Sequence, residues 1–335
     1  MQDAQFFKDN LFNINAQNFE EHALSLFRWQ AIHNPVYQQY ISFLGVKIDE
    51  INQISQIPFL PIAFFKNHRV ITLDTEASVF NDGYFESSGT TGQQRSRHYI
   101  SDFTFYLKVC QYIFELQYAE LSNFHIFALL PSYLDRKHAS LVAMAEHFIQ
   151  QSQSSFSGFY LQDYEKLIEQ LRQAQQSNRK VLLLGVTFAL LDLAEKFRPN
   201  LKDVIVMETG GMKGRRKEII RQELHQILKT ELQVDHIHAE YGMTELLSQA
   251  YAQQDGLFLA PPWMRILIRD VNDPFHFDPK LRYGGINVID LANVHSCAFI
   301  ETQDLGKLHN STNTFEVLGR FDNTDTRGCN LMVSF

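Results

Sequence analysis

Short apolar runs in the middle of the chain constrain the fold most. V-L-L-L-G-V at 181–186 and V-I-V-M-E-T at 204–209 are each followed by a stretch with helical spacing. A similar run, F-H-I-F-A-L-L at 124–130, ends at Pro131 and precedes a predicted helix around 139–150. Buried strands that alternate with helices are typical of a largely parallel sheet with helices on its faces. The sequence therefore predicts an α/β fold.

The segments on either side of this region have other patterns. Apolar residues at helical spacing from Phe19 to Ile32 predict a helix that stops before Pro35. Ser101 is the predicted cap of a further helix. Short strands alternate with turns later in the chain and predict a smaller β-rich subdomain at about 255–320.

Composition excludes several classes of protein. The chain has 335 residues, a formal net charge of −8 and 45% apolar residues, so it is globular and has no broad basic surface for nucleic acid. Three scattered cysteines do not form a disulfide framework or a zinc module. We find no signal peptide and no apolar run long enough to span a bilayer. The expectation is a reduced, soluble, cytoplasmic protein with no membrane insertion.

The segment E-S-S-G-T-T-G at 86–92 contains hydroxyls and glycines but no large apolar group. Such a turn can offer backbone N–H groups and hydroxyls to a phosphate. It matches neither the Walker A motif nor the G-x-G-x-x-G fingerprint. Arg95 and Arg97, just downstream, could supply positive charge. An ordinary polar surface loop remains the alternative.

A second candidate is H-A-E-Y-G-M-T-E-L-L at 238–247, after a predicted strand at 234–239. Tyr241 offers a flat ring, Thr244 a hydroxyl, and Glu245 a hard oxygen ligand at an expected helix start. Together these groups would suit a nucleoside triphosphate with magnesium. The alternative is a strand-to-helix turn with a capping threonine.

Two shorter candidates lie near the end of the chain. Asp304, in E-T-Q-D-L-G, is expected at a strand-to-turn junction, where its carboxylate could accept hydrogen bonds from ribose hydroxyls. Arg320, in G-R-F-D-N, is expected just after a strand and could bind ribose or phosphate. Taken singly, both motifs are more often ordinary turns.

The order of these motifs is more specific than any one of them. S-S-G-T-T-G, G-G-M-K-G-R, Y-G-M-T-E, Q-D-L-G and G-R-F-D follow one another over roughly 84–330, and this order resembles the adenylate-forming superfamily. Within it, S-S-G-T-T-G-Q-Q-R-S, E-T-G-G-M-K-G-R-R and R-G-C-N-L are most similar to the acyl-protein synthetases of bacterial bioluminescence. The phenylacetate-CoA ligase branch is the next most similar.

The resemblance implies that ATP and Mg²⁺ bind to residues of these motifs. The β- and γ-phosphates would contact the loop residues Ser87, Ser88, Gly89, Thr90, Thr91 and Gly92, with Arg95 in place of the family's lysine. Gly210 and Gly211 would flank the adenine and the acyl carboxylate, and Tyr241, beside Gly242, would stack on the base. Thr244 would contact the α-phosphate and Glu245 would bind Mg²⁺. Asp304 and Arg320 would hold the ribose.

The resemblance also predicts how the chain is divided. We expect one large domain over 1–320 and a short tail at 321–335, without the mobile domain that carries the catalytic lysine in most of the superfamily. Another cation, or a partner, must then meet the charge on the α-phosphate. Lys213 is the candidate in the motif, with Arg215 and Arg216 beside it, although a solvated helix start is an alternative reading.

Cys329 lies in D-T-R-G-C-N-L, where Arg327 favours the thiolate and a glycine leaves room for attack on an anhydride. Resemblance to acyl-protein synthetases implies that this cysteine accepts the acyl group and passes it on. The acceptor would be a protein such as an acyl reductase or a carrier protein. A structural cysteine is the alternative, and Cys110 and Cys297 are both expected in the core.

Three functions remain open at this point. The first is ATP-dependent activation of a carboxylic acid, with a fatty acid as the expected substrate, and transfer to Cys329. The second is an acyl- or aryl-CoA ligase in which CoA is the acceptor. The third is a non-catalytic nucleotide-binding subunit, against which Glu245, Asp304 and Arg320 argue.

Overall fold

The computed structural model describes residues 3–74, 83–87, 94–131, 138–161, 163–211, 219–273, 280–309 and 314–321. Its longer helices are α2 (Phe19–His33), α3 (Pro35–Phe43), α5 (Phe103–Gln117), α6 (Ser140–Ser152), α7 (Tyr164–Ala174), α8 (Thr187–Phe197) and α9 (Arg221–Leu232). Shorter helical turns are α1 (Ala4–Asn10), α4 (Phe64–Asn67), η1 (Leu11–Asn13), η2 (Ile48–Glu50), η3 (Ile54–Gln56) and η4 (Leu121–Asn123).

The first eight strands are β1 (Leu60–Pro61), β2 (Tyr84–Glu86), β3 (Arg97–Tyr99), β4 (Phe124–Leu129), β5 (Gly158–Tyr160), β6 (Lys180–Val186), β7 (Val204–Thr209) and β8 (His238–Tyr241). The remaining strands are β9 (Ala250–Ala252), β10 (Leu257–Leu259), β11 (Met264–Arg269), β12 (Tyr283–Asp290), β13 (Phe299–His309) and β14 (Thr314–Arg320).

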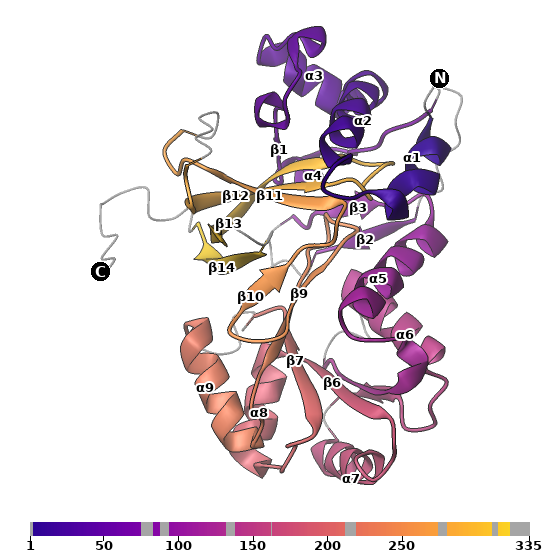
Figure 1. Cartoon of the computed structure of the whole chain (residues 1–335), viewed down its shortest axis with the longest axis vertical. Helices are drawn as coiled ribbons and strands as arrows, with labels where there is room; N and C mark the ends of the chain where they lie inside the picture. The colour runs from indigo at the N-terminus through magenta and orange to yellow at the C-terminus, as the bar shows by residue number, and fades with distance from the viewer. Residues whose placement is uncertain are drawn as a thin grey trace.

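One part of the main sheet is parallel. β5, β4, β6, β7 and β8 are neighbours in that order, and every pair among them is parallel. β4 is buried along its whole length and β6 along all but its first residue. Figure 1 shows α8 and α9 on one side of these strands and α5 and α6 on the other. Burial on both faces explains why these strands are continuous apolar runs, and it confirms the predicted α/β fold.

The other part of the sheet is antiparallel and continues from the first. β9 pairs with β8, and the order then runs through β10, β14, β13, β12 and β11. β1 joins β13 in parallel, and β2 pairs with β3 in a separate hairpin. The residues at about 255–320, predicted as a β-rich subdomain, therefore extend the same sheet in the described structure. The proposed domain boundaries remain a prediction.

Side-chain caps begin several helices, and our expectation of the cap of α5 was wrong. The cap of α5 is Asp102 rather than Ser101, because the Asp102 carboxylate accepts from the N–H of Phe105 at 2.8 Å. The predicted helix that stops before Pro35 is confirmed as α2, which ends at His33, and its residue Ile32 is 58% exposed.

The two cysteines of the described part, Cys110 and Cys297, are fully buried, as predicted. Burial raises the pKa of each thiol to about 12, which keeps both protonated and unreactive. None of the helices among the described residues has the length and apolar character needed to cross a bilayer.

Candidate functional site

The base of the hydroxyl-rich loop is formed by the β2–β3 hairpin. The N–H of Ser87 donates to the carbonyl of Ser96 at 3.0 Å, and the N–H of Ser96 donates to the Ser87 hydroxyl at 3.0 Å. These bonds hold the two ends of the loop together, as a turn that presents donors to an anion requires. The other predicted phosphate-binding residues lie outside the described part of the chain: Ser88, Gly89, Thr90, Thr91 and Gly92.

Arg95 is engaged at the base of this loop. Its Nη1 lies 2.8 Å from Oε2 of Glu86, and Nε of Arg97 lies 3.2 Å from Oε1 of the same carboxylate. Burial opposes ionisation of Glu86, but the hydrogen bonds and charges of the two arginines lower its pKa overall. A phosphate in the loop would have to share Arg95 with Glu86.

The segment that contains Thr244 and Glu245 is a turn, so the predicted helix start at Glu245 was wrong. Asp290 is the physical reason. Its carboxylate accepts from the N–H of Leu247 at 3.0 Å and from the N–H of Ser248 at 2.9 Å. These backbone donors are thus satisfied outside a helix, and the chain continues directly into β9.

Two buried side chains fix the backbone of this turn. Nδ1 of His98, on β3, lies 2.8 Å from the carbonyl oxygen of Thr244, so Nδ1–H is the donor. Nδ2 of Asn293 donates to the carbonyl of Glu245 at 2.9 Å. Burial lowers the pKa of His98 to about 4, although its bond to Thr244 opposes the shift. His98 is therefore neutral at physiological pH and joins the hairpin to the turn.

Glu245 is the carboxylate at the centre of the site. Only 6% of its surface is exposed. Burial raises its pKa, and a nearby Asp304 adds to this effect, whereas a hydrogen bond with Ser96 and the charge of Arg320 oppose it. A carboxylate in this position is stabilised by a cation, and hard oxygen ligands suit Mg²⁺. The described residues contain no group of three or more His, Cys, Asp and Glu side chains that could hold a metal ion. A single carboxylate such as Glu245 suits a Mg²⁺ that also binds substrate phosphates, and this role remains a prediction.

Asp304 and Arg320 lie opposite each other on the neighbouring strands β13 and β14. They are in register between β13 and β14, and Nε of Arg320 donates to Oδ1 of Asp304 at 3.0 Å. The Asp304 side chain is 5% exposed and that of Arg320 is 72% exposed. Asp304 was expected at a strand-to-turn junction but lies within β13, and Arg320, expected just after a strand, is the last residue of β14. The ladder between the strands therefore sets their geometry.

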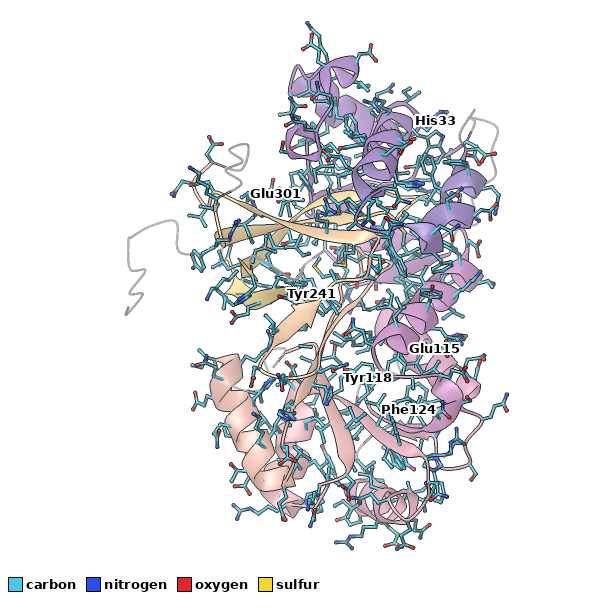
Figure 2. The ribbon with its side chains drawn as sticks, viewed as in Figure 1. His33, Glu115, Tyr118, Phe124, Tyr241 and Glu301 are labelled. Carbon is cyan, nitrogen blue, oxygen red and sulfur yellow. The ribbon has the colours of Figure 1, made fainter. Side chains whose placement is uncertain are left out.

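Tyr241 lies at the centre of the molecule, at the end of β8 (Figure 2). Its hydroxyl donates to Oδ2 of Asp304 at 2.8 Å. Its ring packs against Phe258 and Phe315, with centroid distances of 5.8 and 5.4 Å. Burial and the Asp304 charge raise the pKa of Tyr241 well above its usual value, so the hydroxyl remains a donor. Its predicted contact with a base remains a prediction.

Three glycines lie at the ends of β7 and β8, next to these groups. Gly210 and Gly211 have φ values of +75° and +64°, a left-handed conformation that favours glycine. A β-carbon at Gly242 would come within 2.3 Å of Oε1 of Glu240, which accepts from the hydroxyl of Thr209 through its other oxygen. The backbone is therefore tightly constrained at the edge where the parallel strands end.

Contacts thus connect Ser87, through Ser96, to Glu245 in the Thr244 turn, and a second set of contacts joins Tyr241, Asp304 and Arg320. Arg95 lies at the base of the loop, bound to Glu86. The predicted catalytic residues Lys213 and Cys329 lie outside the described residues. A pocket of about 470 Å³ lies elsewhere, between the C-terminal half of α5 and the β10–β11 connection, and no predicted site residue lines it.

Sequence reasoning missed the residues that support the site: Ser96, His98, Asp290 and Asn293. Ser96 and His98 stand at alternate positions just after the hydroxyl-rich loop. This alternation was the signal in the sequence that could have identified them. No local pattern marks Asp290, because it lies 43 residues from its partner Leu247 in sequence.

No protein-family model matches this sequence, and a search of curated proteins found no match. Solved structures are similar in fold. An open conformation of 2-hydroxyisobutyryl-CoA ligase in complex with 2-HIB-AMP and CoA has a TM-score of 0.66 and 11% identity, over 92% of this chain and 70% of that ligase. Its structure in the thioesterification state has a TM-score of 0.66 and 13% identity, over 94% of this chain and 71% of the ligase. This likeness shows the fold alone, and that fold is the one found in adenylate-forming enzymes.

Proposed function

We propose that this chain activates a carboxylic acid with ATP, forming an acyl-adenylate and pyrophosphate. One observation carries the proposal. The buried carboxylate of Glu245 forms a hydrogen bond with Ser96, at the base of the hydroxyl-rich loop, and interacts electrostatically with Asp304 and Arg320. Phosphate donors, a magnesium ligand and ribose ligands are the three groups that an ATP site needs.

The proposed reaction has two steps. A carboxylate oxygen of the acid attacks the α-phosphorus of ATP, the bond to the β-phosphate oxygen breaks, and pyrophosphate leaves. A thiolate then attacks the acyl carbon of the acyl-adenylate, and AMP leaves with the electron pair of the broken C–O bond. Both steps develop negative charge on phosphate oxygens, so fixed donors and cations at these oxygens lower the barrier.

Each residue of the site has a role in this scheme. Glu245 would hold Mg²⁺, which neutralises the phosphate charge when bound. The Thr244 hydroxyl would donate to the α-phosphate. Asp304 would accept from the ribose hydroxyls, and the exposed guanidinium of Arg320 would lie beside the ribose or phosphate.

For the acceptor we propose Cys329, with a fatty acid as substrate and a partner protein as the final acceptor. The adjacent Arg327 and glycine in the sequence support a reactive thiol at this position. Lys213 is proposed as the cation at the α-phosphate. CoA as the direct acceptor is the second candidate, because the structurally similar ligase was solved in complex with CoA.

Exchange of labelled pyrophosphate into ATP tests the activation step without requiring the acceptor. We expect exchange that depends on a fatty or aromatic acid and is lost when EDTA removes Mg²⁺. A panel of acids of increasing chain length identifies the substrate class. Absence of acid-dependent exchange and of ATP binding by the folded protein would refute the proposal. Protein acylation without added CoA would favour Cys329, and CoA-dependent turnover without acylation would favour the ligase.

A further inference from the structure

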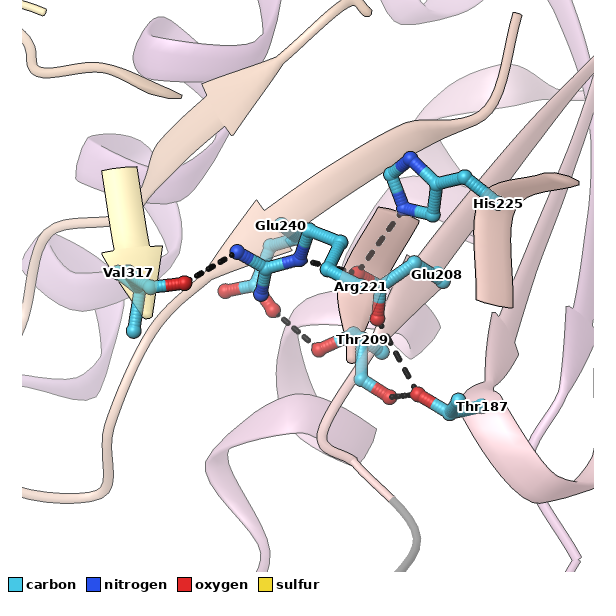
Figure 3. Close-up of polar contacts among 7 residues, drawn as sticks. All are labelled: Thr187, Glu208, Thr209, Arg221, His225, Glu240 and Val317. Carbon is cyan, nitrogen blue, oxygen red and sulfur yellow. Dashed lines mark hydrogen bonds and ion pairs between the residues drawn. The ribbon is translucent and has the colours of Figure 1, made fainter. Parts of the chain in front are cut away.

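Another buried glutamate, Glu208, has no role in the scheme above. Glu208, on β7, is 4% exposed. Its Oε2 accepts from the Thr187 hydroxyl at 3.1 Å, and its Oε1 lies 3.2 Å from Nε of Arg221 and 3.6 Å from Nε2 of His225 (Figure 3). Burial opposes ionisation of Glu208, but these partners lower its pKa overall.

Arg221 connects this carboxylate to the antiparallel part of the sheet. Its Nη1 donates to the backbone carbonyl of Val317 on β14 at 3.0 Å (Figure 3). Its guanidinium carbon lies 4.9 Å from the centre of the Phe258 ring on β10. A β-carbon at Gly256 would come within 2.7 Å of its Cδ, so the adjoining turn packs closely on the side chain. One side chain therefore contacts β7, β10 and β14.

Both ends of this connection lie close in sequence to proposed nucleotide ligands. Glu208 comes two residues before Gly210 on the same chain segment, and Val317 comes three residues before Arg320. Gly210 and Gly211 are the proposed adenine side of the site, and Asp304 with Arg320 is the proposed ribose side. A shift of β14 relative to β7 would change the separation of the two sides.

We propose that Arg221 is a positioning residue that sets the separation between the Gly210–Gly211 turn and the Asp304–Arg320 pair. This proposal rests on the proposed function. Arginine suits the task because its rigid planar group presents several donors in fixed directions, here to acceptors on two different strands. The single ammonium of a lysine cannot reproduce both contacts.

Charge compensation is the competing explanation, because an unpaired buried carboxylate is unfavourable whatever its position. The double variant Glu208→Gln with Arg221→Met distinguishes charge compensation from the positioning role. It removes both charges, and the amide introduced in place of Glu208 keeps an acceptor for Thr187, so the folded state regains stability relative to Arg221→Met alone. The contact to Val317 stays lost in both variants.

The experiment compares wild type, Arg221→Met, Arg221→Lys and the double variant. Arg198→Met is the matched control, since Arg198 follows α8 directly, is 68% exposed, and forms an ion pair with Glu231 of α9 at 2.7 Å. Each protein is measured by thermal melting, by calorimetric titration with ATP and Mg²⁺, and by pyrophosphate exchange. Exchange gives KM for ATP and kcat separately.

We expect Arg221→Met to lower Tm and to raise both Kd and KM for ATP by roughly 10-fold or more, with a smaller change in kcat. The double variant should recover Tm but not ATP affinity. Arg221→Lys should be intermediate in affinity, and Arg198→Met should match wild type. If Arg221→Met fails to fold, the double and lysine variants give the same test.

Two results would overturn the positioning role of Arg221 and leave the proposed function intact. One is wild-type ATP affinity in Arg221→Met. The other is recovery of both Tm and affinity in the double variant, which would show that Arg221 only compensates charge. A wild-type protein that does not bind ATP would overturn the proposed function together with this inference, so the two failures are distinguishable.

Discussion

His98 joins the β2–β3 hairpin to the Thr244 turn, and we expect its contribution to the free energy of unfolding to fall at acidic pH. This side chain is fully buried, and the edge of its ring packs against Phe65 with a centroid distance of 5.7 Å. Its Nδ1–H donates to Thr244, whereas no hydrogen-bond partner is found for its buried Nε2 among the described residues. Protonation of Nε2 would place an unpaired positive charge in the core, which is strongly unfavourable.

The sign and magnitude follow from the two pKa values. An unfolded histidine takes up its proton near pH 6.5, but the folded pKa of His98 is about 4. The contribution of His98 to stability is therefore complete above pH 6.5 and is lost as pH falls towards 4. In this range the free energy of unfolding falls by up to about 1.4 kcal/mol per pH unit. Between pH 7 and pH 5 the loss from His98 is about 2 kcal/mol.

Urea unfolding of wild type and His98→Asn, at several pH values between 7 and 5, measures this term. Asparagine keeps an N–H donor near Thr244 but does not titrate, so the free-energy difference between the two proteins should shrink by about 2 kcal/mol on acidification. The substitution itself adds a pH-independent cost. Parallel pH profiles for wild type and His98→Asn would refute the reasoning.

Three further predictions test the site. Glu245→Gln should reduce pyrophosphate exchange by roughly 100-fold while Tm of the apo protein stays the same or rises, because the change removes a buried charge that burial disfavours; unchanged exchange would contradict the magnesium role. Asp290→Ala should lower the free energy of unfolding by about 3 kcal/mol or more, because four donors lose their acceptor, and a wild-type urea midpoint would contradict this. Cys329→Ser should retain exchange but lose the hydroxylamine-sensitive acyl adduct seen by intact mass, and an adduct of wild-type yield would exclude Cys329 as the acceptor.

The parallel part of the fold could be predicted from sequence because its strands are buried on both faces. Such strands must be continuous apolar runs, and the predicted strand at 204–209 coincides with β7. The sequence did not predict that β8 begins only at His238, four residues later than expected, because the buried Val234 and Ile237 come before it without belonging to a strand. It also did not predict how the antiparallel strands order themselves, since β14 lies between β13 and β10 through long-range pairing.

The candidate site shows the same division between local and distant signals. Side chains whose chemistry is visible in a motif, such as Glu245 and Asp304, were named from the sequence. The expected helix at Glu245 failed because local propensity does not include Asp290, which satisfies the backbone donors of this turn from another strand. Tertiary contacts of this kind override the local preference of a short segment.

The location of Arg95 was predicted correctly from the motif, but its contact with Glu86, which Arg97 shares, was not predicted. The sequence placed Arg95 beside the loop as a source of positive charge, and the structure places it there. However, Glu86 lies one residue before the loop and binds both arginines, at 2.8 and 3.2 Å. Because an arginine that is shared with a carboxylate is weaker as a phosphate ligand than a free one, the positive charge available to the loop is smaller than the motif suggests. Glu245 differs, since burial is the main cause of its raised pKa and the charge of Arg320 offsets that effect only in part. A magnesium ion brought by ATP would stabilise the ionised carboxylate of Glu245, which is why we expect nucleotide binding to depend more strongly on Mg²⁺ than on Arg95.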